Sequence, residues 1–270
     1  MSDDTPTPGS EDEGGTLGEL YFKIQSELDF TKHLGALDAT DEIVELCHIG
    51  PDSLVLDVGC GVGMTAAYLA KTIGCRVTGI DLREAMIARC NERAEREGVT
   101  DRVSFRVADA GALPFDDDAF DVVMCESVLA LVEDQRRVLV EMRRALEPGG
   151  HLGVTEAAWM KPPSEELVSQ LKGTFGHMEP HSPAGWRELI EDAGYEDVVV
   201  DAHGISVLSE SLSRIRRYGL GHLLRSWGHL MKAMVAEPEY RRMLKGAMRE
   251  PKELLSYWGY IVAVANKPAP

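Results

Sequence analysis

The sequence predicts an α/β protein built on a doubly wound sheet of seven mostly parallel strands. Short apolar runs rich in β-branched residues recur along the chain, and amphipathic helical patterns separate most of them. Strands that are apolar along nearly their whole length are typical of parallel sheets with helices on both faces. We also expect helices before the sheet and a helical insertion before its last strand.

Seven strands follow from the apolar runs, and helical spacing of apolar residues fills four of the gaps between them. The expected strands cover residues 54–58, 76–80, 103–107, 121–125, 151–155, 196–200 and 257–265. The expected helices cover residues 64–73, 83–97, 135–146 and 182–194. Pro148 and the two glycines after it end the third helix, whereas Ser182 and Pro183 form a typical helix start. This alternation is what a parallel sheet with crossover helices requires.

Four regions are expected along the chain. Residues 1–15 are acidic and polar and have too little to bury, which predicts a disordered tail. Apolar residues at helical spacing predict a helical cover over residues 16–52. The sheet domain takes residues 53–203 together with residues 256–267. Between the last two strands, helical spacing over residues 204–255 predicts a lid of inserted helices, because this segment is too long for an ordinary connection.

Composition and charge limit the possible partners. The chain has 270 residues, of which 44% are hydrophobic and 27% charged, so a mostly disordered or fibrous protein is excluded. The formal charge of −17 repels phosphate backbones and anionic lipid surfaces, so we expect no nucleic-acid partner and no stable membrane insertion. No apolar run is long enough to span a bilayer and no secretory signal is recognisable, which favours a cytoplasmic location.

The cysteines indicate neither a disulfide framework nor a metal site. They are odd in number and lack a CxxC spacing, so a reducing compartment is expected and no bound metal. The five residues are Cys47, Cys60, Cys75, Cys90 and Cys125. Cys60 and Cys125 are interpreted as small packing residues rather than nucleophiles.

Three glycines directly after the first strand predict a ligand-binding loop. Gly59, Gly61 and Gly63 stand where a strand turns into a helix, and small residues there let backbone N–H groups approach a polar ligand. The dinucleotide fingerprint GxGxxG requires a third glycine at the position of Met64. Binding of a pyrophosphate is therefore disfavoured, although it is not excluded.

Acidic residues lie at or just after the ends of the first three strands. Asp57 makes the glycine loop more acidic than a pyrophosphate site needs, and it suits a cationic ligand instead. Asp81 ends the second strand, where a carboxylate can accept both hydroxyls of a ribose, and Asp109 follows the third strand. Ligands of such sheets bind at the carboxyl ends of the strands. The pattern therefore predicts a site for an adenosine with a positively charged tail, with a helix cap as the alternative role of Asp109.

Several motifs together resemble class I S-adenosylmethionine-dependent methyltransferases, specifically small-molecule enzymes similar to methyltransferase type 11. The motifs are LDVGCGVG, the acid ending strand two, ADAGALPF, DVVMCESVL and LEPGGHLGV. The runs ELDFTKHLGALDATDEI and WMKPPSEEL are similar to a subgroup of these enzymes. This resemblance implies a Rossmann-like fold and S-adenosylmethionine as the cofactor.

The resemblance also implies roles for individual residues. The glycine loop with Asp57 would line the methionine part of the cofactor, Asp81 would bind the ribose, and Asp109 with Ala110 would hold the adenine. The complete set of expected cofactor-binding residues is Asp57, Gly59, Cys60, Gly61, Gly63, Asp81, Leu82, Asp109, Ala110 and Glu126. Glu126 could equally form a salt bridge to a lysine or arginine.

A general base is needed only if the methyl acceptor carries a proton on its attacking atom. The candidate catalytic residues are Glu126, His177 and His181, with Glu156 as a further possible base, because they follow the fourth and fifth strands. An Asn-Pro-Pro-Tyr type of motif is absent after strand four, where Cys125-Glu-Ser-Val stands. Methylation of base or amide nitrogens is therefore disfavoured.

The most favoured function is methyl transfer from S-adenosylmethionine to a small-molecule acceptor, with attack by carbon or oxygen preferred. One alternative is a nicotinamide-dependent oxidoreductase, and another is a cofactor-binding module without turnover. In the expected lid, arginine and lysine outnumber glutamate, which fits either a solvated helical face or a cover for an anionic or amphipathic acceptor. The oligomeric state, monomer or homodimer, is left open.

Overall fold

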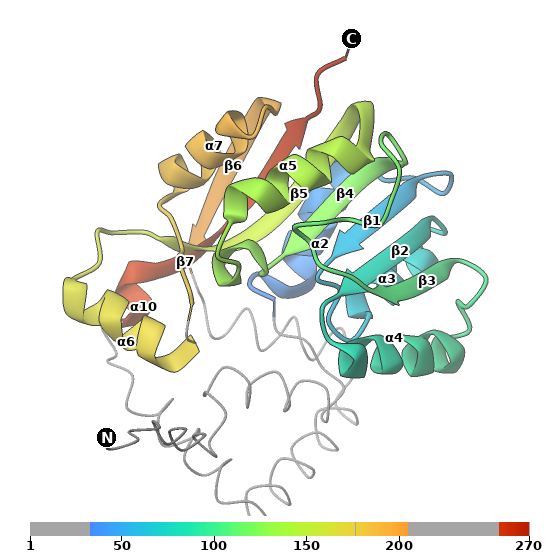
Figure 1. Cartoon of the computed structure of the whole chain (residues 1–270), viewed down its shortest axis with the longest axis horizontal. Helices are drawn as coiled ribbons and strands as arrows, with labels where there is room; N and C mark the ends of the chain where they lie inside the picture. Colours follow the sequence, from blue (N-terminus) through green and yellow to red (C-terminus); the bar gives the residue numbers. More distant parts are fainter. Residues whose placement is uncertain (1–32, 176, 205–253, 270) are drawn as a thin grey trace, which may run out of the picture.

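The computed structural model describes residues 33–175, 177–204 and 254–269. These residues form one seven-stranded sheet in the order β3-β2-β1-β4-β5-β7-β6, with helices on both faces (Figure 1). The predicted fold class is therefore confirmed. The predictions of a disordered tail, of a first helix in the cover and of a helical lid fall on residues 1–32 and 205–253, which lie outside the described residues.

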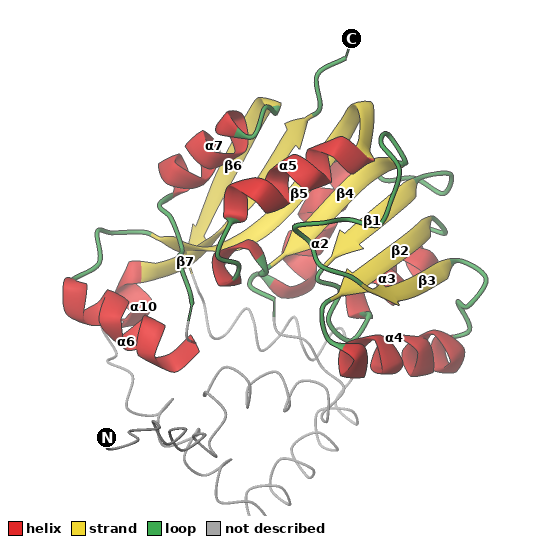
Figure 2. Ribbon diagram, in the orientation of Figure 1, coloured by secondary structure: helices red, strands yellow, loops and turns green. Residues whose placement is uncertain are grey.

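The elements agree closely with the predicted alternation of strands and helices (Figure 2). The strands are β1 (Leu54–Val58), β2 (Arg76–Asp81), β3 (Val103–Val107), β4 (Phe120–Glu126), β5 (Leu146–Trp159), β6 (Glu196–Gly204) and β7 (Trp258–Asn266). The helices are α2 (Ala36–Leu46), α3 (Met64–Thr72), α4 (Glu84–Glu97), α5 (Gln135–Ala145), α6 (Glu165–Phe175), α7 (Pro183–Asp192) and α10 (Leu254–Tyr257), with a 3₁₀ turn η1 at Leu129–Leu131.

Strand pairing places the carboxyl ends of the first five strands at one edge of the sheet. β1 to β5 pair in parallel with their neighbours, whereas β7 runs antiparallel between β5 and β6. Each parallel strand therefore delivers the residues after it to the same edge, where ligands of doubly wound sheets bind.

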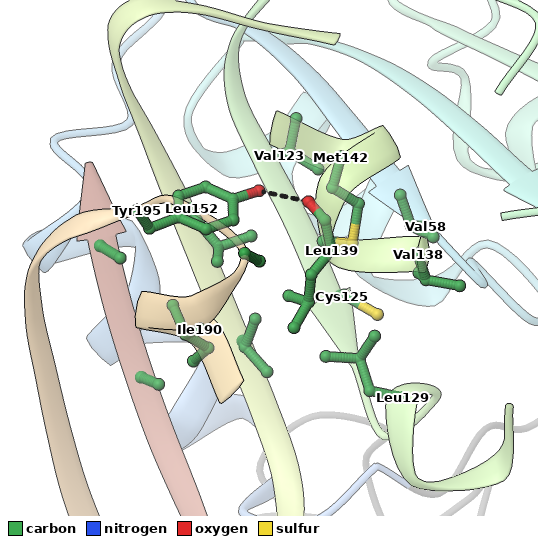
Figure 3. Close-up of a cluster of buried hydrophobic side chains, with 14 of the residues drawn as sticks. Val58, Val123, Cys125, Leu129, Val138, Leu139, Met142, Leu152, Ile190 and Tyr195 are labelled. Atoms are coloured by element: carbon green, nitrogen blue, oxygen red, sulfur yellow. Dashed lines mark hydrogen bonds between the residues drawn. The ribbon is translucent and has the colours of Figure 1, made fainter. Parts of the chain in front are cut away.

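Helices α2, α3 and α4 cover one face of the sheet, and α5 and α7 cover the other (Figure 1). The largest hydrophobic cluster lies under α5 and α7, where Leu139 and Ile190 from the two helices meet Cys125 and Leu152 from the strands (Figure 3). Within this cluster the buried Tyr195 hydroxyl donates to the Leu139 carbonyl at 3.1 Å. The predicted cap of α7 is present, because Ser182 Oγ accepts from Gly185 N at 3.1 Å.

The two largest differences from the sequence prediction concern β5, which also begins five residues earlier than expected, at Leu146, and α6. β5 continues to Trp159, beyond the expected end at residue 155, because β7 pairs with it along this extension as far as Trp258. Helix α6 was not predicted, although Ser164 after two prolines is a helix-start signal, and Ser164 Oγ accepts from Leu167 N at 3.3 Å. Nothing in the described ranges is a helix long and apolar enough to cross a membrane.

Helix α2 is fixed to the sheet by close packing on a glycine. Ile43 is fully buried, and a Cβ on Gly153 of β5 would lie 2.4 Å from Ile43 Cγ2. A side chain at this position would therefore push the helix away from the sheet.

We expect Gly153→Ala to lower the free energy of unfolding by about 1–3 kcal/mol through overpacking, measured by urea denaturation. Gly50→Ala is the matched control, since a Cβ there meets nothing within 4 Å. Equal stability of the two variants would contradict the proposed packing of α2.

Candidate active site

The loop between β1 and α3 approaches the end of β4 so closely that only glycine fits. Gly59 has a φ of 74°, and a Cβ on it would lie 2.3 Å from Val128 Cγ2. Its backbone N–H and that of Cys60 both donate to the Ile80 carbonyl at 2.8 and 2.9 Å. The loop is therefore held between the ends of β2 and β4.

Asp81 at the end of β2 shapes both the loop and the turn that follows its own strand. One carboxylate oxygen accepts from Gly61 N at 3.1 Å and the other from Arg83 N at 2.9 Å. Burial raises the pKa of Asp81, while these hydrogen bonds oppose the rise. Each carboxylate oxygen can accept further hydrogen bonds, so the group can still bind a ligand.

Asp57 lies on β1 beneath the glycine loop and is 2% exposed. Its Oδ2 atom finds no hydrogen-bond donor within the described part of the chain. Burial raises the pKa of Asp57 well above its usual range, and the nearby carboxylates of Glu126 and Asp81 raise it further. Three acids thus gather around one loop, and a positive charge placed there would be stabilised.

Glu126, the last residue of β4, joins two helices to the sheet. Its Oε1 accepts from the Thr40 hydroxyl of α2 at 2.9 Å, and its Oε2 accepts from the Thr65 hydroxyl of α3 at 2.7 Å. His33 Nδ1 lies 3.6 Å from Oε1. The suggested salt bridge to lysine or arginine is not observed among the described residues, where the ionisable partner is His33.

Helix α4 holds the glycine loop through residues that the sequence analysis did not single out. Cys90 Sγ donates to the Gly61 carbonyl at 3.1 Å, and Arg93 Nε donates to the Val62 carbonyl at 2.9 Å. Cys60 Sγ lies 3.7 Å from Cys90 Sγ, and its hydrogen bond to Cys90 together with burial raises the pKa of Cys60. The interpretation of Cys60 as a packing residue agrees with this environment.

Glu156 on β5 organises the turn after β4 instead of facing open space. Its Oε1 accepts from Val128 N and Leu129 N at 2.6 and 2.5 Å, and its Oε2 accepts from Ala130 N at 3.3 Å. Because Val128 packs against Gly59, Glu156 supports the glycine loop indirectly. Its carboxylate is occupied by backbone N–H groups, so a role as a freely accessible base is not supported.

The remaining predicted cofactor-binding residues are on the segments that follow β2 and β3. Asp109 Oδ1 accepts from Gly111 N at 2.8 Å in a local turn, and Ala110 packs against the core. Leu82 is 66% exposed beside Asp81. The structure therefore shows no contact between Asp109 and the glycine loop.

The two histidine candidates lie on the segment before α7. His181 Nε2 hydrogen-bonds to Gln135 Oε1 at 2.6 Å and its ring packs edge-on against Trp186, so it fastens this segment to α5. Burial lowers the pKa of His181. The buried His177 Nε2 has no hydrogen-bond partner within the described ranges.

Comparison with known proteins identifies the central region of the chain. Residues 56–154 match the model of the methyltransferase domain family. The chain is 27% identical over 226 residues to an uncharacterized protein of Haemophilus influenzae, covering 83% of this chain and 89% of that one. It is 38% identical over 136 residues to the methyltransferase GfsG of Streptomyces halstedii, covering 50% of this chain and 49% of the relative. The chain thus spans about half of that curated methyltransferase.

Other relatives are named for methyl transfer to different atoms, nitrogen in some and carbon in others. They include phosphoethanolamine N-methyltransferase 1 of Arabidopsis thaliana, the sarcosine/dimethylglycine N-methyltransferase of Halorhodospira halochloris and a sterol 24-C-methyltransferase of Gibberella zeae. The first is 31% identical and covers 68% of this chain, while the chain spans 37% of that relative.

Solved structures share the fold at lower identity. The [4+2]-cyclase SpnF has a TM-score of 0.73 and 22% identity, covering 94% of this chain and 96% of its own. The Haemonchus contortus phosphoethanolamine N-methyltransferase 2, in complex with phosphomonomethylethanolamine and S-adenosylhomocysteine, has a TM-score of 0.73 and 20% identity, covering 93% and 58%. A neighbour described as a cyclase shows that this fold does not specify the reaction by itself.

The chain carries a methyltransferase domain of the class I S-adenosylmethionine-dependent family. The resemblance indicated by the sequence motifs, including the enzyme class and its cofactor, is therefore confirmed. The acceptor molecule is not identified by these comparisons.

Glu156 gives a prediction for the dependence of stability on pH. Burial raises its pKa from 4.5 to about 7, although the backbone N–H groups oppose the rise. Between these values the folded state holds a proton that the unfolded state has lost. We expect the free energy of unfolding, relative to Glu156→Gln, to be highest below pH 4.5 and to fall by about 3 kcal/mol as pH rises through 7.

The measurement is urea denaturation of both proteins at several pH values, with Glu147→Gln on the same strand as the exposed control. A difference between wild type and Glu156→Gln that stays constant with pH would refute the assignment.

Proposed function

We propose that this protein transfers the methyl group of S-adenosylmethionine to a small-molecule acceptor, with attack by carbon or oxygen. The observation that carries the proposal is the convergence of Asp57, Asp81 and Glu126 on the glycine loop. S-adenosylmethionine supplies a methyl group on a positively charged sulfur, which is itself a good leaving group. The protein then has to bind and orient the cofactor and the acceptor, and to exclude water from between them.

The buried acids suit the charges of this cofactor. Asp57 Oδ2 lacks a donor among the described residues, and an ammonium or another cationic group of the ligand would satisfy it. Asp81 retains acceptor capacity for the ribose hydroxyls. The acids disfavour a pyrophosphate, so a nicotinamide dinucleotide suits this site less well.

The other predicted cofactor contacts follow from the same placement. We assign Gly59, Gly61 and Gly63 with Cys60 to the methionine side, Leu82 beside Asp81 to the ribose, and Asp109 with Ala110 to the adenine. Glu126 contributes its negative charge. The domain assignment stays as expected from the sequence, with the helical cover and lid enclosing the acceptor.

Asp81→Asn should weaken binding of S-adenosylhomocysteine by roughly 5- to 150-fold, which corresponds to about 1–3 kcal/mol for an unpaired buried hydrogen-bonding group. Isothermal titration calorimetry measures this directly, with NADH as a second ligand. Asp52→Asn, an exposed acid before β1, is the matched control and should bind normally. Wild-type affinity in Asp81→Asn would remove the ribose assignment, and binding of NADH alone would favour the oxidoreductase alternative.

Turnover separates an enzyme from a binding module. We expect S-adenosylhomocysteine to form faster with a suitable phenol or β-dicarbonyl compound than without an acceptor, measured by chromatography. Asp81→Asn at subsaturating cofactor should lose this excess. Tight binding of the cofactor without turnover across phenols, carbon acids and amines would favour the module.

A further inference from the structure

His33 lies directly against the end of β4. Its Nδ1 is 3.6 Å from Glu126 Oε1, and the two side chains are only 8% and 5% exposed. The next residue, Leu34, donates its backbone N–H to Ser127 Oγ at 3.1 Å. Two successive residues before α2 thus contact two successive residues at the end of β4, which holds the imidazole beside the carboxylate.

The surroundings of Glu126 make this contact more than a packing interaction. Among the described residues, its hydrogen-bond donors are the hydroxyls of Thr40 and Thr65, which orient the carboxylate without neutralising it. Thr65 stands two residues after Gly63, so its hydrogen bond to Glu126 places this carboxylate close to the glycine loop. His33 is therefore held beside the group of acids that would surround the cofactor.

We propose that His33 is the general base of the reaction and that Glu126 is its positioning residue. This inference rests on the proposed methyl transfer. The contact of 3.6 Å between Nδ1 and Glu126 Oε1 is longer than a hydrogen bond, and in the proposed reactive state it shortens to one. Nδ1 then carries the proton of the neutral imidazole, and Nε2 is the basic nitrogen.

In the proposed step, Nε2 of His33 takes the proton from the attacking atom of the acceptor. The electron pair of that atom forms the bond to the methyl carbon, while the pair of the breaking carbon–sulfur bond stays on sulfur and leaves S-adenosylhomocysteine. Glu126 stabilises the imidazolium until it releases the proton to solvent. A base of this kind is required only when the attacking atom carries a proton. With the proposed attack by carbon or oxygen, the acceptor class is therefore a hydroxyl compound or a carbon acid.

The sulfonium charge allows a test that needs no acceptor. S-adenosylmethionine is positively charged at sulfur and S-adenosylhomocysteine is not, so a protonated His33 near the reacting methyl repels only the former. We expect the ratio of the Kd of S-adenosylmethionine to that of S-adenosylhomocysteine to fall roughly three- to tenfold between about pH 5.5 and about pH 8.5. Calorimetry on the full chain gives both constants.

Other titrating groups face the same region, so the part of the pH dependence that comes from His33 must be separated from theirs. Asp57 from β1, Asp81 from β2, Glu126 from β4 and Glu156 from β5 all remain in His33→Gln and His33→Asn. These variants should bind S-adenosylhomocysteine and should lose most of the pH dependence of the ratio. Two variants are used so that, if one of them fails to fold, the other still tests the proposal. Circular dichroism reports whether each variant is folded.

A second histidine–glutamate pair, formed between β6 and α2, is the matched control. His203 Nε2 on the edge strand β6 lies 3.5 Å from Glu42 Oε2 on α2, and the two side chains are 35% and 29% exposed. His203→Gln should keep the pH dependence of the wild type. Glu126→Gln should move its midpoint to lower pH, because the imidazolium loses its stabilising charge.

Three outcomes would overturn the inference. The ratio could be independent of pH in the wild type, or its pH dependence could survive in both His33 variants. Equal weakening of both ligands without a change in the ratio would instead mean that His33 only holds the cover in place. If neither ligand binds the folded wild type at any pH, the proposed function itself fails. This result is distinct from the case in which both ligands bind but their ratio does not depend on His33.

Discussion

The buried carboxylate of Glu126 is the interaction on which the arrangement of the site depends. A charge removed from water must be compensated by donors, and here these come from α2 through Thr40 and from α3 through Thr65. The same group therefore stabilises the end of β4 and the position of the two helices that flank it. Any movement of α2 away from the sheet would leave this carboxylate without one of its donors.

The glycine loop is held in place mainly by hydrogen bonds of its own backbone groups. Three of its N–H groups, those of Gly59, Cys60 and Gly61, donate to the end of β2. Two of its carbonyls accept from Cys90 and Arg93 of α4. This leaves the carboxylates beneath and beside the loop, chiefly Asp57, as the polar groups with unused capacity. The backbone of the loop is thus fixed by hydrogen bonds, while carboxylates with unused acceptor capacity lie where a ligand is expected.

The sequence was sufficient for the succession of strands and helices along the chain and for the positions of the acids at the ends of β1 and β2, because these signals are local. Glu126 was predicted as a site residue, but its hydrogen-bond partners were not, because they are 61 and 86 residues away and meet it only after α2 and α3 have packed on the sheet. The length of β5 was missed for a similar reason, since its extension is stabilised by β7. For α6 a local signal at Ser164 existed and was overlooked.

The antiparallel strand β7 has a consequence for the order of assembly. It lies between β5 and β6, although β6 ends at Gly204 and β7 begins only at Trp258. During synthesis the parallel strands from β1 to β5 can pair as they emerge, whereas β6 has no neighbour in the sheet until the ribosome has released residues 258–266. Until then β5 and β6 both present open edges, and a nascent chain in this state is exposed to pairing with other chains.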